Sequence, residues 1–170
     1  IQSRSYIDFN VLNKYLESFF ISRIGLRALI GNYVNLCKYN TGLLCDCSPK
    51  SILENSIEDI ENATRFIYQD DISIKIIEHS EKIILQSIPS HLYYIFFEIL
   101  KNSVQAHMEG YHSHKPIVIE INKTESGIYI RIRDMGKSFP INKLEKVFSF
   151  SYSTNKDKQL YNTDSLVYSE

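Results

Sequence analysis

The sequence predicts an α+β fold in which a helical-bundle segment precedes a domain of helices packed on one face of a mixed sheet. A long helical pattern of apolar residues opens the chain, and two further helical patterns follow it. Short apolar segments with the period of strands lie between and after these helices. Because some of these strands are separated by a helix and others by a tight turn, we expect both parallel and antiparallel pairing.

The composition is that of an ordinary globular chain. Of the 170 residues, 44% are hydrophobic and 23% are charged. The formal net charge of −1 gives no electrostatic footprint for nucleic acid or an anionic membrane. No run approaches the roughly 18 apolar residues of a membrane span. We therefore expect neither nucleic acid nor a membrane span.

The cysteines and the first residue indicate the cellular setting. The three cysteines are an odd and sparse set, which favours a reducing compartment. The C-x-C pair at Cys45 and Cys47 is a weak metal candidate, because no second ligand pair is in sight. Since the chain begins at Ile1 and shows no Arg-rich leader, we expect a processed or trimmed product.

The first half of the chain predicts two helices and a short strand. Apolar residues recur at helical spacing from about Asp8 to Lys38, which is longer than most globular helices and predicts a member of a bundle. Asn40 to Ser48 should connect this helix to the next and contain a short strand. Ser48 is then a natural N-cap, with Pro49 at the first helical position, and the helix should continue to about Gln69.

Strand candidates surround a third helix. They cover Ile72 to Ile77, Lys82 to Gln86, Ile117 to Ile121 and Gly127 to Arg133. The last two are joined by the turn K-T-E-S-G, which predicts a hairpin.

The third helix, from Ser90 to Gly110, has two different faces. Pro89 should end the preceding segment, Ser90 should be the N-cap, and Gly110 should follow the last turn. One stripe is apolar or small and should bury against the sheet; it consists of Leu92, Ile95, Phe96, Ile99, Ser103 and Ala106. The other face is polar and consists of Tyr94, Glu98, Lys101, Asn102, Gln105 and Glu109.

The last predicted strand ends next to an acid. Ile128, Ile130 and Ile132 share one face by the strand's period of two, and Asp134 has the same parity. A carboxylate therefore points to the apolar side, where it needs hydrogen-bond donors from the protein or from a ligand. On these grounds the polar helix face remains either an ordinary solvated surface with a Glu98–Lys101 pair or part of a binding site.

The motifs E-x-x-K-N on a helix and D-x-G after a strand resemble those of the GHKL ATP-binding proteins. Within that superfamily the chain is similar to the mitochondrial kinases of pyruvate dehydrogenase and of the branched-chain 2-oxoacid dehydrogenase. The resemblance implies a Bergerat-type ATP-binding α/β sandwich preceded by helices of a regulatory bundle. Its most specific segments are Leu12 to Arg27, Ile88 to Asn102, and S-Y-S-T at Ser151 to Thr154.

The resemblance implies that this domain binds ATP and Mg²⁺. Asn102 would supply a carbonyl oxygen to Mg²⁺, Glu98 would orient or deprotonate an acceptor serine, and Lys101 would offset phosphate charge. Asp134 would accept a hydrogen bond from the adenine amino group, beside Gly136.

A second group of expected ATP contacts lies further along the chain. Ser153 and Thr154 match the start of the family's ATP lid, and an ordinary loop role is about equally open for them. Ser138 replaces the second glycine of D-x-G-x-G, and it retains a hydroxyl for a phosphate.

Other positions depart from the family. Gln105 replaces a usual arginine in the ATP site, and Tyr94 stands where the pyruvate-type kinases carry histidine and the branched-chain type carries tyrosine. The second glycine box is missing, although Tyr161 to Glu170 resembles the strand that follows it. We therefore interpret the segment from Lys158 to Leu160 as the place from which the lid and glycine loop are missing.

The resemblance predicts bundle helices in residues 1–40 and an ATP-binding domain in 41–170. It implies a protein-serine kinase of the mitochondrial matrix that inactivates the decarboxylase subunit of a pyruvate or branched-chain dehydrogenase complex. Its implied partners are that subunit, the lipoyl domain of the acyltransferase core, and a second copy in a homodimer.

Two other classes of function are weighed against this kinase. Ser138, Gln105 and the missing box favour a non-catalytic nucleotide-binding regulator. A chaperone-type or mismatch-repair ATPase is disfavoured by the preceding helix, and a phosphorelay kinase is disfavoured because all five histidines follow that helix.

Overall fold

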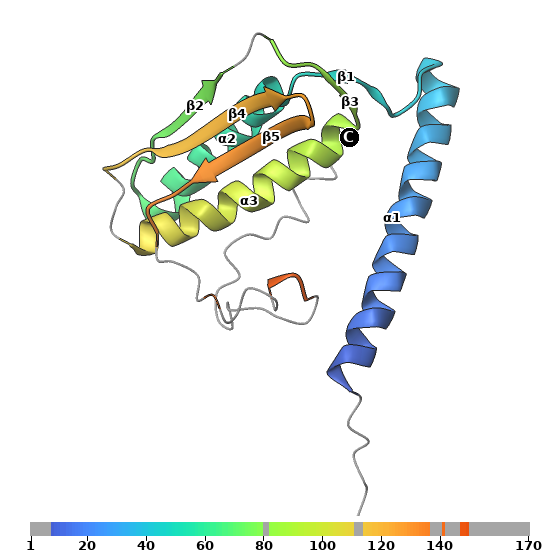
Figure 1. Cartoon of the computed structure of the whole chain (residues 1–170), viewed down its shortest axis with the longest axis horizontal. Helices are drawn as coiled ribbons and strands as arrows, with labels where there is room; N and C mark the ends of the chain where they lie inside the picture. Colours follow the sequence, from blue (N-terminus) through green and yellow to red (C-terminus); the bar gives the residue numbers. More distant parts are fainter. Residues whose placement is uncertain (1–7, 80–81, 111–113, 137–140, 142–146, 150–170) are drawn as a thin grey trace, which may run out of the picture. The chain divides into compact units, whose positions relative to one another are not determined.

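The computed structural model describes residues 8–79, 82–110, 114–136, 141 and 147–149 of the chain. The chain divides into two compact units, one of residues 26–138 and the other of residues 1–25 together with 139–170. Figure 1 shows the elements in sequence colours. In order they are α1 (Phe9–Tyr39), β1 (Cys45–Cys47), α2 (Pro49–Tyr68), β2 (Ile74–Glu78), β3 (Leu85–Ser87), α3 (Pro89–Glu109), β4 (Ile117–Thr124) and β5 (Gly127–Arg133).

The central sheet is mixed, as the sequence predicts. Its order is β2-β4-β5, in which β2 pairs parallel to β4 and β4 pairs antiparallel to β5. Gly127 closes the β4–β5 hairpin opposite Thr124 with a φ of 148°, a backbone conformation that favours glycine. The described strands β1 and β3 form a separate antiparallel pair.

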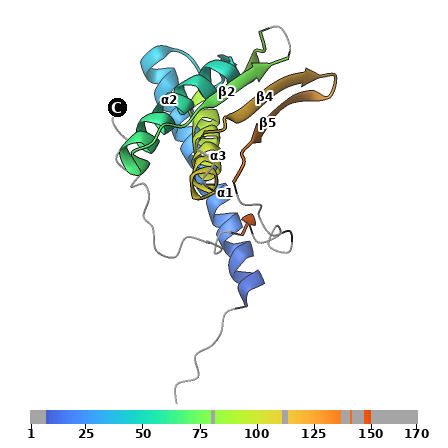
Figure 2. The same ribbon diagram turned by 90° about the vertical axis from the view of Figure 1, so that its left-hand side faces the viewer.

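Helices α2 and α3 cover one face of this sheet (Figure 2). The alternating isoleucines Ile117, Ile119 and Ile121 of β4 are fully buried at the centre of the core. Isoleucines of β2 and β5 pack against this core, as the period of two predicts for β5. From the helices the core receives Ile52, Leu53, Ile57, Ile60, Phe96, Phe97, Leu100 and Val104.

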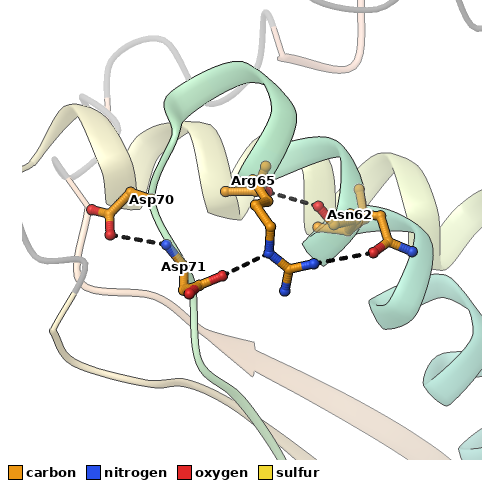
Figure 3. A network of polar contacts seen from close by, with 6 residues as sticks. Asn62, Arg65, Asp70 and Asp71 are labelled. Atoms are coloured by element: carbon orange, nitrogen blue, oxygen red, sulfur yellow. Dashed lines mark hydrogen bonds and ion pairs between the residues drawn. The ribbon is translucent and has the colours of Figure 1, made fainter.

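Helix α2 begins and ends at the predicted residues. Ser48 is its N-cap and accepts a hydrogen bond from the Ser51 amide at 3.4 Å, while Pro49 occupies the first turn. At the other end Gln69 adopts a left-handed conformation and donates its amide to the Arg65 carbonyl. Figure 3 shows how the Arg65 guanidinium then bridges Asn62 and Asp71 just beyond the helix.

Helix α3 differs from the prediction at its start and on its buried side. Its N-cap is Ile88, which makes no side-chain cap, and Pro89 is its first residue, so Ser90 lies inside the helix. Proline fits this position because the first amides of a helix lack intrahelical partners. Gly110 follows the last turn as predicted, and its conformation is right-handed.

The buried stripe of α3 was predicted in the wrong rotational phase. Ile95 and Ile99 are 49% and 45% exposed, whereas the predicted stripe buried them. The face against the core consists of Phe96, Phe97, Leu100, Val104 and His107. The periodicity did not determine the phase, because α3 carries apolar residues on several sides and only the packing of α2 and the sheet selects one of them.

Helix α1 exposes most of its large apolar side chains, including Tyr15, Phe19, Leu29 and Tyr33. Its membership of a helical bundle stays a prediction. Asn32 accepts a hydrogen bond from the Leu43 amide at 2.9 Å, which secures the chain as it leaves the helix. No helix in the described residues has the length and apolar character needed to cross a lipid bilayer.

Candidate functional site

The polar face of α3 carries a close ion pair. The Lys101 ammonium lies 2.6 Å from a Glu98 carboxylate oxygen, and the two side chains are 19% and 30% exposed. Residues three apart lie on neighbouring positions of the same helix surface, which permits this contact. The ion pair orients the Glu98 carboxylate toward Lys101.

The next turn of the same face presents carboxamides. Asn102 is exposed, and the described residues give its side chain no hydrogen bond. Gln105 donates to a Glu109 carboxylate oxygen at 3.0 Å. Asn102 thus offers an oxygen donor that a hard cation accepts, whereas Gln105 is already engaged.

The D-M-G turn follows β5 directly. The Asp134 carboxylate accepts a hydrogen bond from the Gly136 amide at 2.9 Å through Oδ1, and its residue is half-buried. Within the described residues Oδ2 has no hydrogen bond, so this second oxygen is available to a donor that is not part of the turn.

The D-M-G turn packs tightly on the backbone of α3. A Cβ on Gly136 would lie 2.5 Å from the carbonyl carbon and oxygen of Ala106, so only glycine permits this approach. Ala106 is four residues after Asn102 and therefore on the same helix face, roughly 6 Å along the axis. Figure 1 shows the end of β5 near the carboxyl-terminal end of α3. The contact therefore packs the D-x-G turn on the helix that carries the E-x-x-K-N motif.

The roles of two contact residues of this joint, His107 and Ala106, were not predicted from the sequence. The Met135 amide donates to Nδ1 of His107 at 3.3 Å, and Ala106 forms the surface against Gly136. His107 could have been found by its spacing, because it lies seven residues after Leu100 on the core face. The predicted contacts Ser138, Ser153 and Thr154, and the segment from Lys158 to Leu160, lie outside the described residues.

Strand β1 carries the C-x-C pair that the sequence offers as a weak metal candidate. Cys45 is exposed, and the half-buried Cys47 thiol donates to the Leu85 carbonyl. Burial, followed by the nearby Cys45 and Asp46, raises the pKa of the Cys47 thiol above its ordinary value. In the part of the chain that the structure describes, no group of three or more His, Cys, Asp or Glu side chains is placed to hold a metal ion.

The joint between helix and turn lies within a region that matches a known family. The sequence profile described as histidine kinase-, DNA gyrase B-, and HSP90-like ATPase matches residues 87–165. Residues 87–165 are therefore similar to the GHKL ATPases. This match includes the E-x-x-K-N helix and the D-x-G turn, and it confirms the superfamily that the motifs predicted.

Curated relatives extend the likeness beyond the GHKL domain. The chain is 30% identical over 160 residues to a mitochondrial pyruvate dehydrogenase (acetyl-transferring) kinase of Drosophila melanogaster, covering 82% of this chain and 38% of that protein. It is 27% identical to the corresponding Arabidopsis thaliana protein, covering 86% of this chain and 42% of that one. The chain thus spans about two fifths of the length of these relatives, and it is similar to mitochondrial pyruvate dehydrogenase kinases, as predicted.

Solved structures share the fold of the GHKL domain. The catalytic domain of the histidine kinase ThkA in a nucleotide-free form aligns with a TM-score of 0.56 at 13% identity, covering 66% of this chain and 70% of that domain. A second nucleotide-free form of the same domain aligns with a TM-score of 0.55. These alignments confirm the α+β fold.

Proposed function

We propose that the chain is part of an ATP- and Mg²⁺-dependent protein-serine kinase acting on the decarboxylase subunit of a mitochondrial 2-oxoacid dehydrogenase complex. The observation that carries this proposal is the packing of the D-M-G turn on α3, one helical turn from Asn102. An ATP site requires a carboxylate that recognises the base and a side chain that binds the cation. Asp134 in the turn and Asn102 on α3 could provide these two groups. The names of the curated relatives favour the pyruvate complex over the branched-chain complex.

The residues of this joint fit ATP and Mg²⁺. Asn102 would hold Mg²⁺ through its exposed side-chain oxygen, and bound Mg²⁺ would neutralise charge on the phosphates. Lys101 would contribute a second positive charge. The remaining Oδ2 of Asp134 would accept the adenine amino group, and Gly136 keeps the turn close to the helix.

Glu98 is our candidate for the catalytic base. It lies one helical turn before Asn102, so its carboxylate would be close to the phosphates and to an incoming serine hydroxyl. The ion pair with Lys101 would hold the carboxylate in place until it accepts the proton. Gln105, Ser138, Ser153 and Thr154 complete the proposed ATP contacts.

The domain organisation and cellular context belong to the same proposal. We assign bundle helices to residues 1–40 and the ATP-binding domain to 41–170. The exposed apolar residues of α1 support a bundle, since such a surface is normally covered. The names of the mitochondrial relatives support a mitochondrial location. The matrix as the compartment, and a homodimer and the lipoyl domain of the acyltransferase core as partners, are part of the proposal.

A second candidate is a nucleotide-binding regulator without turnover. It is favoured by Gln105, which replaces a family arginine and is bonded to Glu109 instead of offering a positive charge. This candidate predicts ATP binding without phosphate transfer.

Phosphate transfer to the dehydrogenase tests both candidates. The full-length protein would be incubated with γ-labelled ATP, Mg²⁺ and the purified decarboxylase subunit of either complex, and the labelled residue would be mapped. We expect label on a serine, with Glu98→Gln lowering kcat about 10²- to 10⁴-fold while ATP still binds. Glu54→Gln, on an exposed position of α2, is the matched control.

The outcomes separate the candidates. ATP binding without label would support the regulator, and absence of ATP binding would overturn both functions. Label that persists in Glu98→Gln at the wild-type rate would remove Glu98 as the base.

A further inference from the structure

His107 is buried on the core face of α3 and faces the D-M-G turn. Its side chain is 0% exposed. Nδ1 accepts the Met135 amide at 3.3 Å, and within the described part of the chain Nε2 has no hydrogen-bond partner. A polar ring thus occupies a position that an apolar side chain would fill.

The hydrogen bond determines the form of the ring. A ring nitrogen that accepts a hydrogen bond carries no proton, so the neutral imidazole keeps its proton on Nε2. A buried N–H without a partner destabilises the folded state. The hydrogen bond between Nδ1 and the Met135 amide offsets part of this cost.

That amide lies at the middle of the turn. Met135 is flanked by Asp134, whose Oδ1 accepts the Gly136 amide, and by Gly136, whose backbone packs on Ala106. The bond to His107 is therefore the side-chain contact that ties the Met135 peptide to α3. If this peptide rotated, the carboxylate of the preceding residue would move with it.

We propose that His107 is a positioning residue that fixes Asp134 for recognition of an adenine base. This inference rests on the proposed nucleotide-binding function. Nδ1 holds the Met135 amide, the turn is thereby fixed, and Oδ2 of Asp134 points in one direction. Adenine offers an amino group to that oxygen, whereas guanine presents a carbonyl oxygen there and is repelled. His107 therefore controls the preference for ATP over GTP and does not control the affinity for the phosphate groups.

Two substitutions at one position separate hydrogen bonding from packing. His107→Leu fills most of the volume and removes the acceptor. His107→Asn is smaller, but its side-chain oxygen replaces Nδ1 as an acceptor for the Met135 amide. Val104→Ala is the matched control, because Val104 is 1% exposed on the same core face and has no bond to the turn.

Amide exchange and nucleotide affinity are the two readouts, measured on the full chain. In His107→Leu we expect the Met135 amide to exchange with solvent at least about 10-fold faster relative to the amides of β4, ATP to bind about 10-fold more weakly, and GTP affinity to change less than about 2-fold. His107→Asn should restore both properties, and a nitrogen NMR spectrum of the wild type should show the Nε2–H tautomer. Val104→Ala should lower stability without a selective change at Met135.

Each result supports or overturns the inference. Equal losses in His107→Leu and His107→Asn would show that His107 acts through packing. Unchanged Met135 exchange in His107→Leu would show that the hydrogen bond does not hold the turn. If the wild type binds no nucleotide, the proposed function and the role in base recognition both fail, while the exchange data still decide whether His107 fixes the turn.

Discussion

The two faces of α3 differ in role: one packs in the hydrophobic core, and the other carries the polar groups of the candidate site. The face with Leu100 and Val104 is almost completely buried against α2 and the sheet. The opposite side exposes Ile99 and Asn102 and carries the Glu98–Lys101 pair. The buried face holds the helix in place, so the exposed face can keep polar groups in fixed positions without contributing much to folding. Substitutions on the two faces should therefore affect different measurements.

The largest expected effect is on the buried face. Leu100→Ala removes a fully buried side chain and leaves a cavity, so it should lower the free energy of unfolding by about 2 to 5 kcal/mol. Ile99→Ala, on the neighbouring exposed position, should change it by less than about 1 kcal/mol. Chemical denaturation measures the free energy of unfolding of both variants. Similar decreases in the two variants would show that the two faces contribute equally to stability.

Asn102→Ala should produce the opposite pattern. We expect kcat for phosphate transfer to fall about 10²- to 10³-fold, because an oxygen donor at a highly charged site is lost. The free energy of unfolding should remain within about 0.5 kcal/mol of wild type, since Asn102 is exposed. Asn55→Ala, an exposed position of α2, provides the control. An Asn102→Ala variant with wild-type Mg²⁺ dependence would contradict the proposed role.

Gly136→Ala tests the joint between the D-M-G turn and α3. The added methyl group would meet the Ala106 backbone, so we expect a loss of about 1 to 3 kcal/mol and weaker ATP binding. Gly25→Ala is the matched control, because nothing lies within 4 Å of its added Cβ and alanine favours a helix. Its thermal midpoint should rise slightly. A Gly136→Ala variant as stable as wild type would show that the turn can move away from α3.

The smallest expected effect concerns the ion pair. Lys101→Met should lower the free energy of unfolding by less than about 1 kcal/mol, because a partly exposed pair contributes little to stability. ATP affinity, measured by calorimetry at low and high salt, should nevertheless fall most at low salt. If Lys101→Met lowers the free energy of unfolding by more than it lowers the free energy of ATP binding, the ion pair has a structural role.

Local signals predicted the ends of several elements. Ser48 followed by Pro49 predicted the start of α2, because a cap and a fixed φ act within a few residues. The period of two predicted β5 at its observed bounds, Gly127–Arg133. The strand before α3 was predicted from Lys82 and begins only at Leu85. Pairing with three-residue β1 sets this length, and no local pattern encodes it.

The contacts that carry the candidate site could be predicted only in part. The sequence predicted Asp134 and Asn102 as polar groups at the end of a strand and on a helix. It did not predict that Gly136 would meet Ala106 or that Met135 would bind His107, since both contacts depend on how α3 rotates against the sheet. The unknown rotation of α3 is also why Ile95 was wrongly predicted to be buried.

The parallel pairing of β2 with β4 has a consequence for the order of folding. The β4–β5 hairpin joins neighbouring residues and closes a short loop, whereas Ile74 must meet Ile117 across the whole of α3. Long-range contacts of this kind form slowly, because a long loop must first lose its conformational entropy. We therefore expect the hairpin to form before β2 pairs with β4, because β3 and α3 lie between β2 and β4 in the chain.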